Sequence, residues 1–113
     1  MTYTLIHNPN CSTSRKGLEL LQANGAAPKL RKYMSDGERL TVEELKAIAK
    51  KLKAKSPREF LRANEAEGPA ADAPDEAVYA AMAENPRLIQ RPIGINGRKA
   101  VLGRPVERLL EIL

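Results

Sequence analysis

The sequence predicts an α/β protein in which helices lie beside a mixed β-sheet. A strand–helix–strand order opens the chain, helical periodicity fills its middle, and a hairpin followed by a helix closes it. A length of 113 residues suits one domain, residues 1–113, since domains commonly run to about 100–150 residues. The 42% apolar and 29% charged fractions are those of ordinary globular proteins and argue against disorder or fibrous repeats.

The first third of the chain has the pattern of a βαβ unit. Residues 2–6 are β-branched and aromatic and end in a polar turn over 7–10, which predicts a strand. Residues 16–24 carry Leu18 and Leu21 at helical spacing and stop at Asn24-Gly25. Residues 29–34 then form a second predicted strand, parallel to the first.

The middle of the chain is predominantly helical. Thr41 and Glu44 form a capping box ahead of an apolar stripe that ends at Leu52. Ser56 caps a second, short helix that we expect to carry residues 60–62. Residues 64–74 are predicted to form a mobile loop, and residues 75–84 a further helix.

The last quarter changes from helical to strand periodicity and back. Ile93 and Ile95 alternate up to Asn96-Gly97, a strong hairpin-turn dipeptide, and residues 99–102 form the return strand. Pro105 then opens a closing helix with apolar residues at 106, 109, 110 and 113.

Charge and composition exclude several partners. The 19 basic and 14 acidic residues give a net charge of +5, but the main lysine cluster, residues 46–55, reads as the solvated face of a helix. With three Tyr, one Phe and no Trp, the chain lacks the stacking platforms of single-strand nucleic-acid binders. No apolar run is long enough to span a membrane or to form a signal peptide, so we expect a cytoplasmic protein without nucleic-acid or membrane partners.

The single cysteine, Cys11, lies between a predicted strand and a predicted helix. One cysteine excludes an internal disulfide and a multi-cysteine zinc site, and we expect no metal. A helix N-terminus lowers a thiol pKa, and the amides and hydroxyls of Ser12, Thr13 and Ser14 could also cradle a tetrahedral oxyanion. The alternative is a buried thiol acting as a small hydrophobic group. If Cys11 turns over, an external thiol or partner protein must complete the cycle, because the chain has no second sulfur to resolve an adduct.

Three arginines stand out downstream, at 62, 91 and 104. Arg91 and Arg104 directly precede prolines, which hold the preceding residue in an extended conformation. The planar guanidinium suits bidentate contact with oxyanions, although any one of these arginines could equally be an ordinary surface charge.

Four blocks of sequence, taken in order, resemble the glutaredoxin-coupled arsenate reductase family. They are His7-Asn8-Pro9-Asn10-Cys11-Ser12-Thr13-Ser14-Arg15, then Phe60-Leu61-Arg62, then Arg91-Pro92-Ile93 with Asn96-Gly97, and last Gly103-Arg104-Pro105. The resemblance spans the whole chain and implies a thioredoxin-like α/β fold, a mixed four-stranded sheet flanked by helices, with a helical insertion. It also implies a cis bond before Pro92.

The resemblance further implies that Cys11 is the nucleophile, assisted by Ser14, whose hydroxyl would bond the thiolate. Arg62, Arg91 and Arg104, together with Ser12 and Thr13, would bind the arsenate oxygens. His7 either lowers the thiol pKa or acts as a structural hydrogen-bonding residue. No cofactor would be bound; glutathione would be the co-substrate and glutaredoxin the partner of a monomeric enzyme.

Two other functions fit the same resemblance. One is a glutathione-dependent thiol reductase of another substrate, and the other is a non-enzymatic RNA polymerase-binding regulator of the Spx type. Ser14 stands where the redox switch of such regulators generally has a second cysteine. The chain also departs from the family over residues 65–74, which look short, rich in Ala and Pro, and without an aromatic residue.

Overall fold

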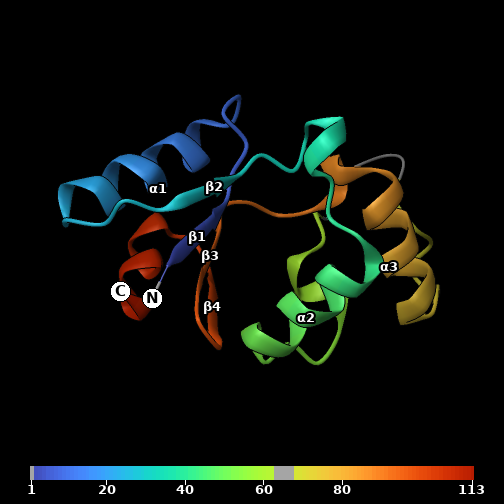
Figure 1. The fold of residues 1–113 in the computed structure, drawn as a ribbon. Helices are drawn as coiled ribbons and strands as arrows, with labels where there is room; N and C mark the ends of the chain where they lie inside the picture. The colour runs from blue at the N-terminus through green and yellow to red at the C-terminus, as the bar shows by residue number, and fades with distance from the viewer. Residues whose placement is uncertain (1, 63–67) are drawn as a thin grey trace.

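A four-stranded sheet forms the centre of the computed structural model, which describes residues 2–62 and 68–113 (Figure 1). Its strands are β1 (Tyr3–Ile6), β2 (Lys29–Arg31), β3 (Ile93–Asn96) and β4 (Lys99–Leu102), in the spatial order β2-β1-β3-β4. β1 and β2 are parallel, whereas β3 is antiparallel to both of its neighbours. The mixed sheet and the parallel βαβ opening are therefore confirmed, as is the hairpin turn, where Gly97 has φ 64°.

Helices cover both faces of this sheet (Figure 1). One face carries α1 (Ser12–Ala23) and the 3-10 helix η4 (Val106–Ile112). The other carries α2 (Val42–Leu52), α3 (Asp75–Glu84) and three short 3-10 helices, η1 (Asp36–Glu38), η2 (Pro57–Phe60) and η3 (Pro86–Leu88). No helix in the part of the chain that the structure describes is both long and apolar enough to cross a membrane.

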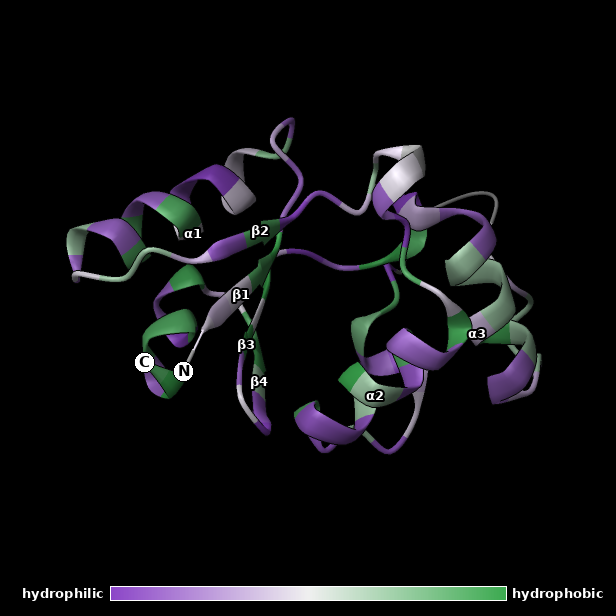
Figure 2. Ribbon diagram, in the orientation of Figure 1, coloured by the Kyte–Doolittle hydropathy of each residue, from purple (hydrophilic) through white to green (hydrophobic). Residues whose placement is uncertain are grey.

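Alternation along β1 sends its side chains into two separate cores. Tyr3 and Leu5 face α1 and η4, where they pack with Leu21 and Leu109. Ile6 faces the opposite core, built mainly from α2, α3 and the segments around them. Figure 2 shows the apolar residues along the inner parts of the sheet and the polar residues on the outer turns of α1 and α2. The sheet is thus buried on both faces, and its strand ends are the places left for polar residues.

Two predicted helices differ in extent or type. α1 begins at Ser12 rather than at residue 16. The predicted start was too late because Ser12, Thr13 and Ser14 form the first turn of the helix, although such hydroxyl residues usually favour loops. The closing helix is 3-10 rather than α-helical. Its Leu109 carbonyl accepts a hydrogen bond from Tyr3 Oη at 2.7 Å, and Ile112 accepts one from Asn96 Nδ2 at 2.7 Å. The Leu109 carbonyl is the acceptor that the Leu113 amide would use in an α-helix.

The two predicted caps of the middle segment have different outcomes. The Thr41–Glu44 capping box is present at the start of α2. Ser56 also caps η2, but Glu59 accepts from the Lys55 amide, and the helix ends at Phe60. The expectation that this helix carries residues 61 and 62 is wrong, because the chain there pairs instead with residues 88 and 89.

The predicted mobile loop, residues 64–74, lies partly outside the described residues, which resume at Gly68. In the described part, Arg58 Nη2 donates to the carbonyls of Ala70 and Ala73, at 2.8 and 2.9 Å. These bonds tie residues 70–73 to η2. The mobility of the loop remains a prediction.

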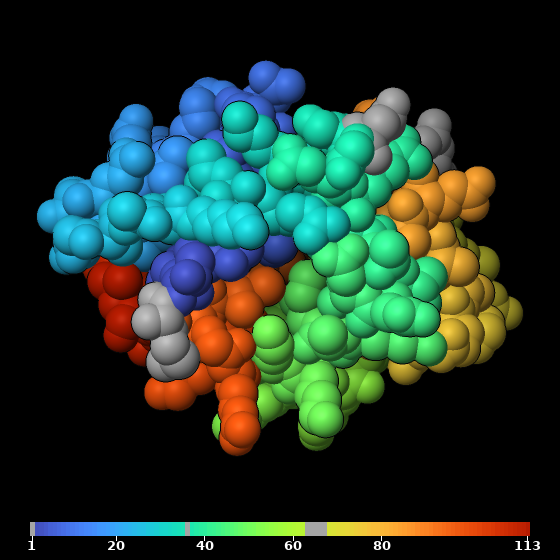
Figure 3. All heavy atoms as spheres, in the orientation of Figure 1, coloured from blue at the N-terminus to red at the C-terminus, as the bar shows by residue number. Residues whose placement is uncertain are grey.

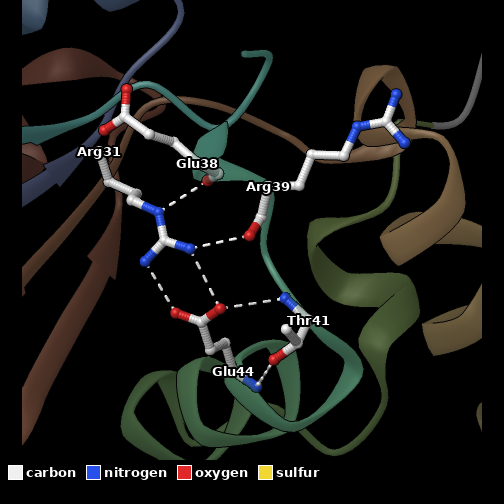
Figure 4. Close-up of polar contacts among 5 residues, drawn as sticks. All are labelled: Arg31, Glu38, Arg39, Thr41 and Glu44. Carbon is white, nitrogen blue, oxygen red and sulfur yellow. Dashed lines mark hydrogen bonds and ion pairs between the residues drawn. The ribbon is translucent and has the colours of Figure 1, made fainter. Parts of the chain in front are cut away.

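Arg31 fastens the end of β2 to the start of α2 (Figure 4). Its guanidinium forms a bidentate pair with the Glu44 carboxylate, at 2.8 and 3.1 Å, and donates to the carbonyls of Glu38 and Arg39, at 2.7 and 2.8 Å. The hydrogen bond from Arg31 is the main cause that lowers the pKa of Glu44. The same carboxylate closes the capping box with Thr41, so one network fixes the backbone where β2 ends.

Gly94 leaves the space that one core requires. A Cβ at this position of β3 would meet the Tyr3 ring and would lie 3.0 Å from Leu109 Cδ2. Tyr3 cannot move away without losing its bond to the Leu109 carbonyl. We therefore expect Gly94→Ala to lower the free energy of unfolding by about 1–3 kcal/mol, measured by urea denaturation. Gly37→Ala is the control, since nothing lies within 4 Å of its Cβ position; equal effects of the two substitutions would contradict this account.

Candidate active site

Cys11 is the N-cap residue of α1, directly after the loop that leaves β1. Its backbone is extended, with φ −102° and ψ 123°, and its amide donates to the Asn8 carbonyl at 3.0 Å. The thiol is partly exposed. The alternative of a fully buried, hydrophobic cysteine is therefore wrong, because Cys11 is only partly buried.

The surroundings of Cys11 favour the thiolate. Burial raises the pKa of the thiol, but the Ser14 amide, the Arg91 guanidinium and the Thr13 amide act in the opposite direction, and the net pKa is lowered. A helix N-terminus and a guanidinium thus combine to activate Cys11, as its position in the sequence predicts.

Ser14 differs from the expectation that its hydroxyl bonds the thiolate. Its buried Oγ lies 2.7 Å from His7 Nδ1 and accepts from the Asn8 amide at 3.0 Å. It is the backbone amide of Ser14, rather than the hydroxyl, that lowers the Cys11 pKa. Of the neighbouring candidates, Ser12 is exposed and Thr13 half-buried on the same first turn.

His7 is a buried residue that holds the loop in place. Burial lowers its pKa, and Lys32 and Arg15 lower it further, so His7 is neutral at pH 7. The lowered pKa favours the neutral imidazole over a cation beside Cys11. Its Nδ1 pairs with Ser14 and its amide donates to the Arg31 carbonyl at 3.0 Å. Of the two roles considered, the structure favours the hydrogen-bonding one.

His7 should make the stability of the protein depend on pH. Its pKa in the folded state lies below that of the unfolded chain, so between the two values the unfolded state binds more protons and stability rises with pH. We expect the urea midpoint to fall as pH is lowered from 7.5 to 5.5, and to fall less in His7→Gln. His7 is the chain's one histidine, so its imidazole NMR signals report the titration directly; a titration at or above pH 6.5 would contradict this prediction.

Arg91 is the guanidinium that acts on Cys11. Its side chain is 9% exposed, and the Arg91–Pro92 bond is cis, as the resemblance implies. Its Nη1 reaches the carbonyls of Arg87 and Ile89 only at 3.5 Å each, while Nε is buried without a hydrogen-bond partner. Hydrogen bonds of this kind are ordinarily about 2.9–3.0 Å long, so these two bonds to backbone carbonyls are weak.

Arg62 and Arg104 are connected to the segment around Arg91 by different hydrogen bonds. The Arg62 amide donates to the Leu88 carbonyl at 2.8 Å, which places residue 62 beside the segment that leads into Arg91. Arg62 also lowers the pKa of Tyr33, which Cys11 and Arg91 influence too. Arg104 is exposed, and its Nε donates to the Arg91 carbonyl at 2.9 Å. Arg62 therefore lies beside the segment before Arg91 and acts on Tyr33, and Arg104 is fastened to the backbone of Arg91.

Sequence analysis missed two residues of this site. Asn8 is buried and organises the loop: its Oδ1 accepts from the Asn10 amide at 3.0 Å and its carbonyl from Cys11. An asparagine four residues before a helix is the pattern that could have indicated this role. Tyr33 is fully buried, and its hydroxyl has no hydrogen-bond partner. Nothing in the sequence distinguishes it from a core tyrosine.

A hollow lies elsewhere, between the sheet and α2. It has a volume of about 540 Å³ and is lined by residues such as Ile6, Leu30, Ile48 and Lys51, but not by Cys11 or the three arginines. Figure 3 shows this region between the cyan atoms that follow β2 and the green atoms of α2. The described residues contain no group of three or more His, Cys, Asp or Glu that could hold a metal ion. The chemistry of Cys11, rather than cavity size, identifies the candidate site.

Comparison with known proteins adds a family to this geometry. The model of the ArsC family matches residues 6–112. The chain belongs to the ArsC family. An arsenate reductase of Haemophilus influenzae is 38% identical over the full length of both chains. An arsenate reductase of Neisseria meningitidis is 35% identical over 96% of each chain.

The ArsC fold is also confirmed by solved structures. An arsenate reductase from Vibrio cholerae superposes with a TM-score of 0.92 at 40% identity, covering 100% of this chain and 98% of the other. The thioredoxin-like fold with a mixed four-stranded sheet, inferred from the resemblance, is therefore correct. Within this ArsC chain, the helical insertion corresponds to α2, η2, α3 and η3, which separate β2 from β3.

Proposed function

We propose that the chain is a single-domain, monomeric arsenate reductase of the cytoplasm. Cys11 is its nucleophile, Arg62, Arg91 and Arg104 bind the oxyanion, no cofactor is bound, and glutathione and glutaredoxin act as co-substrate and partner. The observation that supports this best is the partly exposed Cys11, whose pKa is lowered by the first turn of α1 and by the nearly buried Arg91. The family relatives named arsenate reductases give the substrate.

The proposed reaction begins with attack of the Cys11 thiolate on the As(V) atom, from which one oxygen leaves as water. Glutathione displaces a second oxygen, also as water, and forms an arsenic–sulfur bond. A thiolate of glutaredoxin then attacks the glutathione sulfur; the electron pair of the broken bond reduces arsenic to As(III), and glutaredoxin keeps the glutathionyl group. Water finally releases arsenite and restores the Cys11 thiol.

The need for external thiols follows from the chain itself. Cys11 is its one sulfur capable of exchange, so no internal disulfide can form. Ser14, where a dithiol motif would have its second cysteine, is buried and bonded to His7 and Asn8. The electrons must therefore come from separate molecules.

The arginines and the thiolate have separate tasks in this proposal. Cationic guanidinium groups attract any tetrahedral oxyanion, so they do not by themselves distinguish arsenate from phosphate. Covalent attack by sulfur, to which arsenic is more susceptible, gives the discrimination. Ser12 and Thr13 contribute the first-turn amides, of which that of Thr13 already acts on the Cys11 pKa.

Arsenite formation is the direct test. The purified chain is incubated with arsenate, glutathione, glutaredoxin and an NADPH-coupled glutathione reductase, and arsenite is quantified by chromatography. We expect arsenite and NADPH consumption in equal amounts, and no turnover when either thiol component is omitted. Turnover without glutaredoxin would agree with an arsenate reductase but would refute glutaredoxin as its partner.

A negative result would point to the other enzymatic function. If arsenate is not reduced while Cys11 still titrates as a reactive thiol, the chain should be assayed as a glutathione-dependent reductase of organic thiol adducts. That activity needs no oxyanion clamp, so Arg104→Ala should then leave turnover unchanged.

A further inference from the structure

Tyr33 lies two residues beyond the end of β2 and has an unusual environment for a core residue. Its side chain is fully buried, yet its hydroxyl has no hydrogen-bond partner. Burial raises its pKa to about 12, and the charges that act on it are those of the candidate site: Arg91, Cys11 and Arg62. A buried hydroxyl without a hydrogen-bond partner lowers the stability of the fold. Its presence at this position therefore indicates a role other than stabilising the fold.

Arg91 presents the complementary case. Its Nε is a buried donor without a partner, and its two hydrogen bonds to backbone carbonyls, from Nη1, are both 3.5 Å long. Arg91 also lowers the Tyr33 pKa, through its charge and through a hydrogen-bonding contribution, so the guanidinium lies near the phenol. The Tyr33 hydroxyl nevertheless has no partner with the geometry of a formed hydrogen bond. Arg91 Nε and Tyr33 Oη are therefore a buried donor and a buried acceptor in the same region, and neither has a well-formed hydrogen bond.

The backbone of Tyr33 is firmly held, so Arg91 is the partner that can move. The Tyr33 amide donates to the Arg31 carbonyl at 3.0 Å, and the same carbonyl accepts from His7. The Arg31 side chain is fixed by the network that joins it to Glu44 (Figure 4). Tyr33 is thus part of the rigid frame that also positions the loop before Cys11.

We propose that Tyr33 is a positioning residue of the oxyanion site. When an oxyanion binds at Cys11, Arg91 turns so that its Nε donates to Tyr33 Oη. This bond fixes the guanidinium with both terminal nitrogens toward the anion. The phenol remains protonated at neutral pH, so its own O–H can also donate a hydrogen bond to the bound anion.

This inference rests on the proposed function only in taking an oxyanion as the ligand. It explains why two polar atoms stay unmatched in the unliganded protein: their hydrogen bond forms on binding and contributes to affinity rather than to folding. Removing the Tyr33 hydroxyl should therefore weaken binding without loss of stability. Removing a hydroxyl that is already bonded should do the reverse.

The experiment compares Tyr33→Phe with Tyr3→Phe, a buried tyrosine in the other core whose hydroxyl donates to Leu109 at 2.7 Å. Cys11 is alkylated with iodoacetamide at pH 7 in the presence of increasing arsenate or, separately, sulfate, which is not reduced. Stability is measured by urea denaturation. We expect Tyr33→Phe to raise the half-protecting concentration of either anion about tenfold, with an equal or higher urea midpoint. Tyr3→Phe should lower the midpoint and leave protection unchanged.

The outcomes separate this inference from the proposed function. Equal half-protecting concentrations in wild type and Tyr33→Phe would overturn it, as would a wild type that neither anion protects. A wild type that both anions protect, but that forms no arsenite, would refute the arsenate reductase and leave the role of Tyr33 to be decided by the comparison of variants. A lower urea midpoint in Tyr33→Phe would show that the hydroxyl serves the fold and would also overturn it.

Discussion

Cys11→Ser should abolish arsenate reduction, with a loss of turnover of about a thousandfold or more. The substitution changes one atom, and the first turn of α1 and the Arg91 guanidinium remain in place. A serine hydroxyl, however, does not ionise at neutral pH and cannot form the arsenic–sulfur bond on which the proposed reaction depends. Removal of a covalent nucleophile ordinarily costs far more than removal of a binding group.

Two measurements make this prediction specific. Turnover is assayed with the complete thiol system, and the binding of sulfate to Cys11→Ser is measured by calorimetry to show that the oxyanion site survives. In wild type, iodoacetamide should modify one cysteine at a rate that follows a pKa below the ordinary value of a free thiol. A variant that retained a tenth of the wild-type turnover would refute Cys11 as the nucleophile.

The principal elements of the fold could be predicted from local sequence signals. Thr41 and Glu44 marked the start of α2, and the Asn96-Gly97 pair marked the β3–β4 hairpin, because capping and turn chemistry depend on residues close in sequence. The helix type at the C-terminus could not be predicted in this way. It depends on Tyr3, more than a hundred residues away, which takes the Leu109 carbonyl.

In the candidate site, too, features that depend on neighbouring residues could be predicted, and those that depend on distant residues could not. The position of Cys11 between a strand and a helix was sufficient to predict a thiol of lowered pKa. The sequence could not show that the Ser14 hydroxyl turns toward His7, since that choice depends on how the loop folds back. Nor could it show that Tyr33 lies beside Arg91, because the chain brings residues 33 and 91 together only through the tertiary fold.

Arg91→Ala should reduce the activity of the site in two ways. It removes a positive charge that favours the thiolate, so the pKa of Cys11 should rise and the thiolate fraction at pH 7 should fall. It also removes the guanidinium proposed to hold the oxyanion as charge develops. Loss of one such donor typically costs about a hundredfold to a thousandfold in turnover, so we expect a loss of at least about a hundredfold at pH 7.

The pH dependence separates these two effects. Alkylation of Cys11 by iodoacetamide should be slower in Arg91→Ala at pH 7 and should approach the wild-type rate at high pH, once both thiols are ionised. Arsenate turnover should not recover in the same way, because a high pH restores the thiolate but not the clamp. Full recovery of turnover at high pH would show that Arg91 acts on Cys11 alone.

Arg91→Lys and Arg98→Ala complete the comparison. Lysine keeps the charge but lacks the planar fork of arginine. Arg91→Lys should therefore leave the lowered pKa of Cys11 largely in place but weaken the binding of arsenate. Arg98 is exposed beside the β3–β4 turn, and its removal changes the net charge equally without affecting the site. If Arg98→Ala lowered the affinity for arsenate as much as Arg91→Ala does, the general attraction of the anion to the basic chain would explain binding without a specific role for Arg91. If only Arg91→Ala and Arg91→Lys lose affinity, the guanidinium beside Tyr33 is the group that recognises the oxyanion.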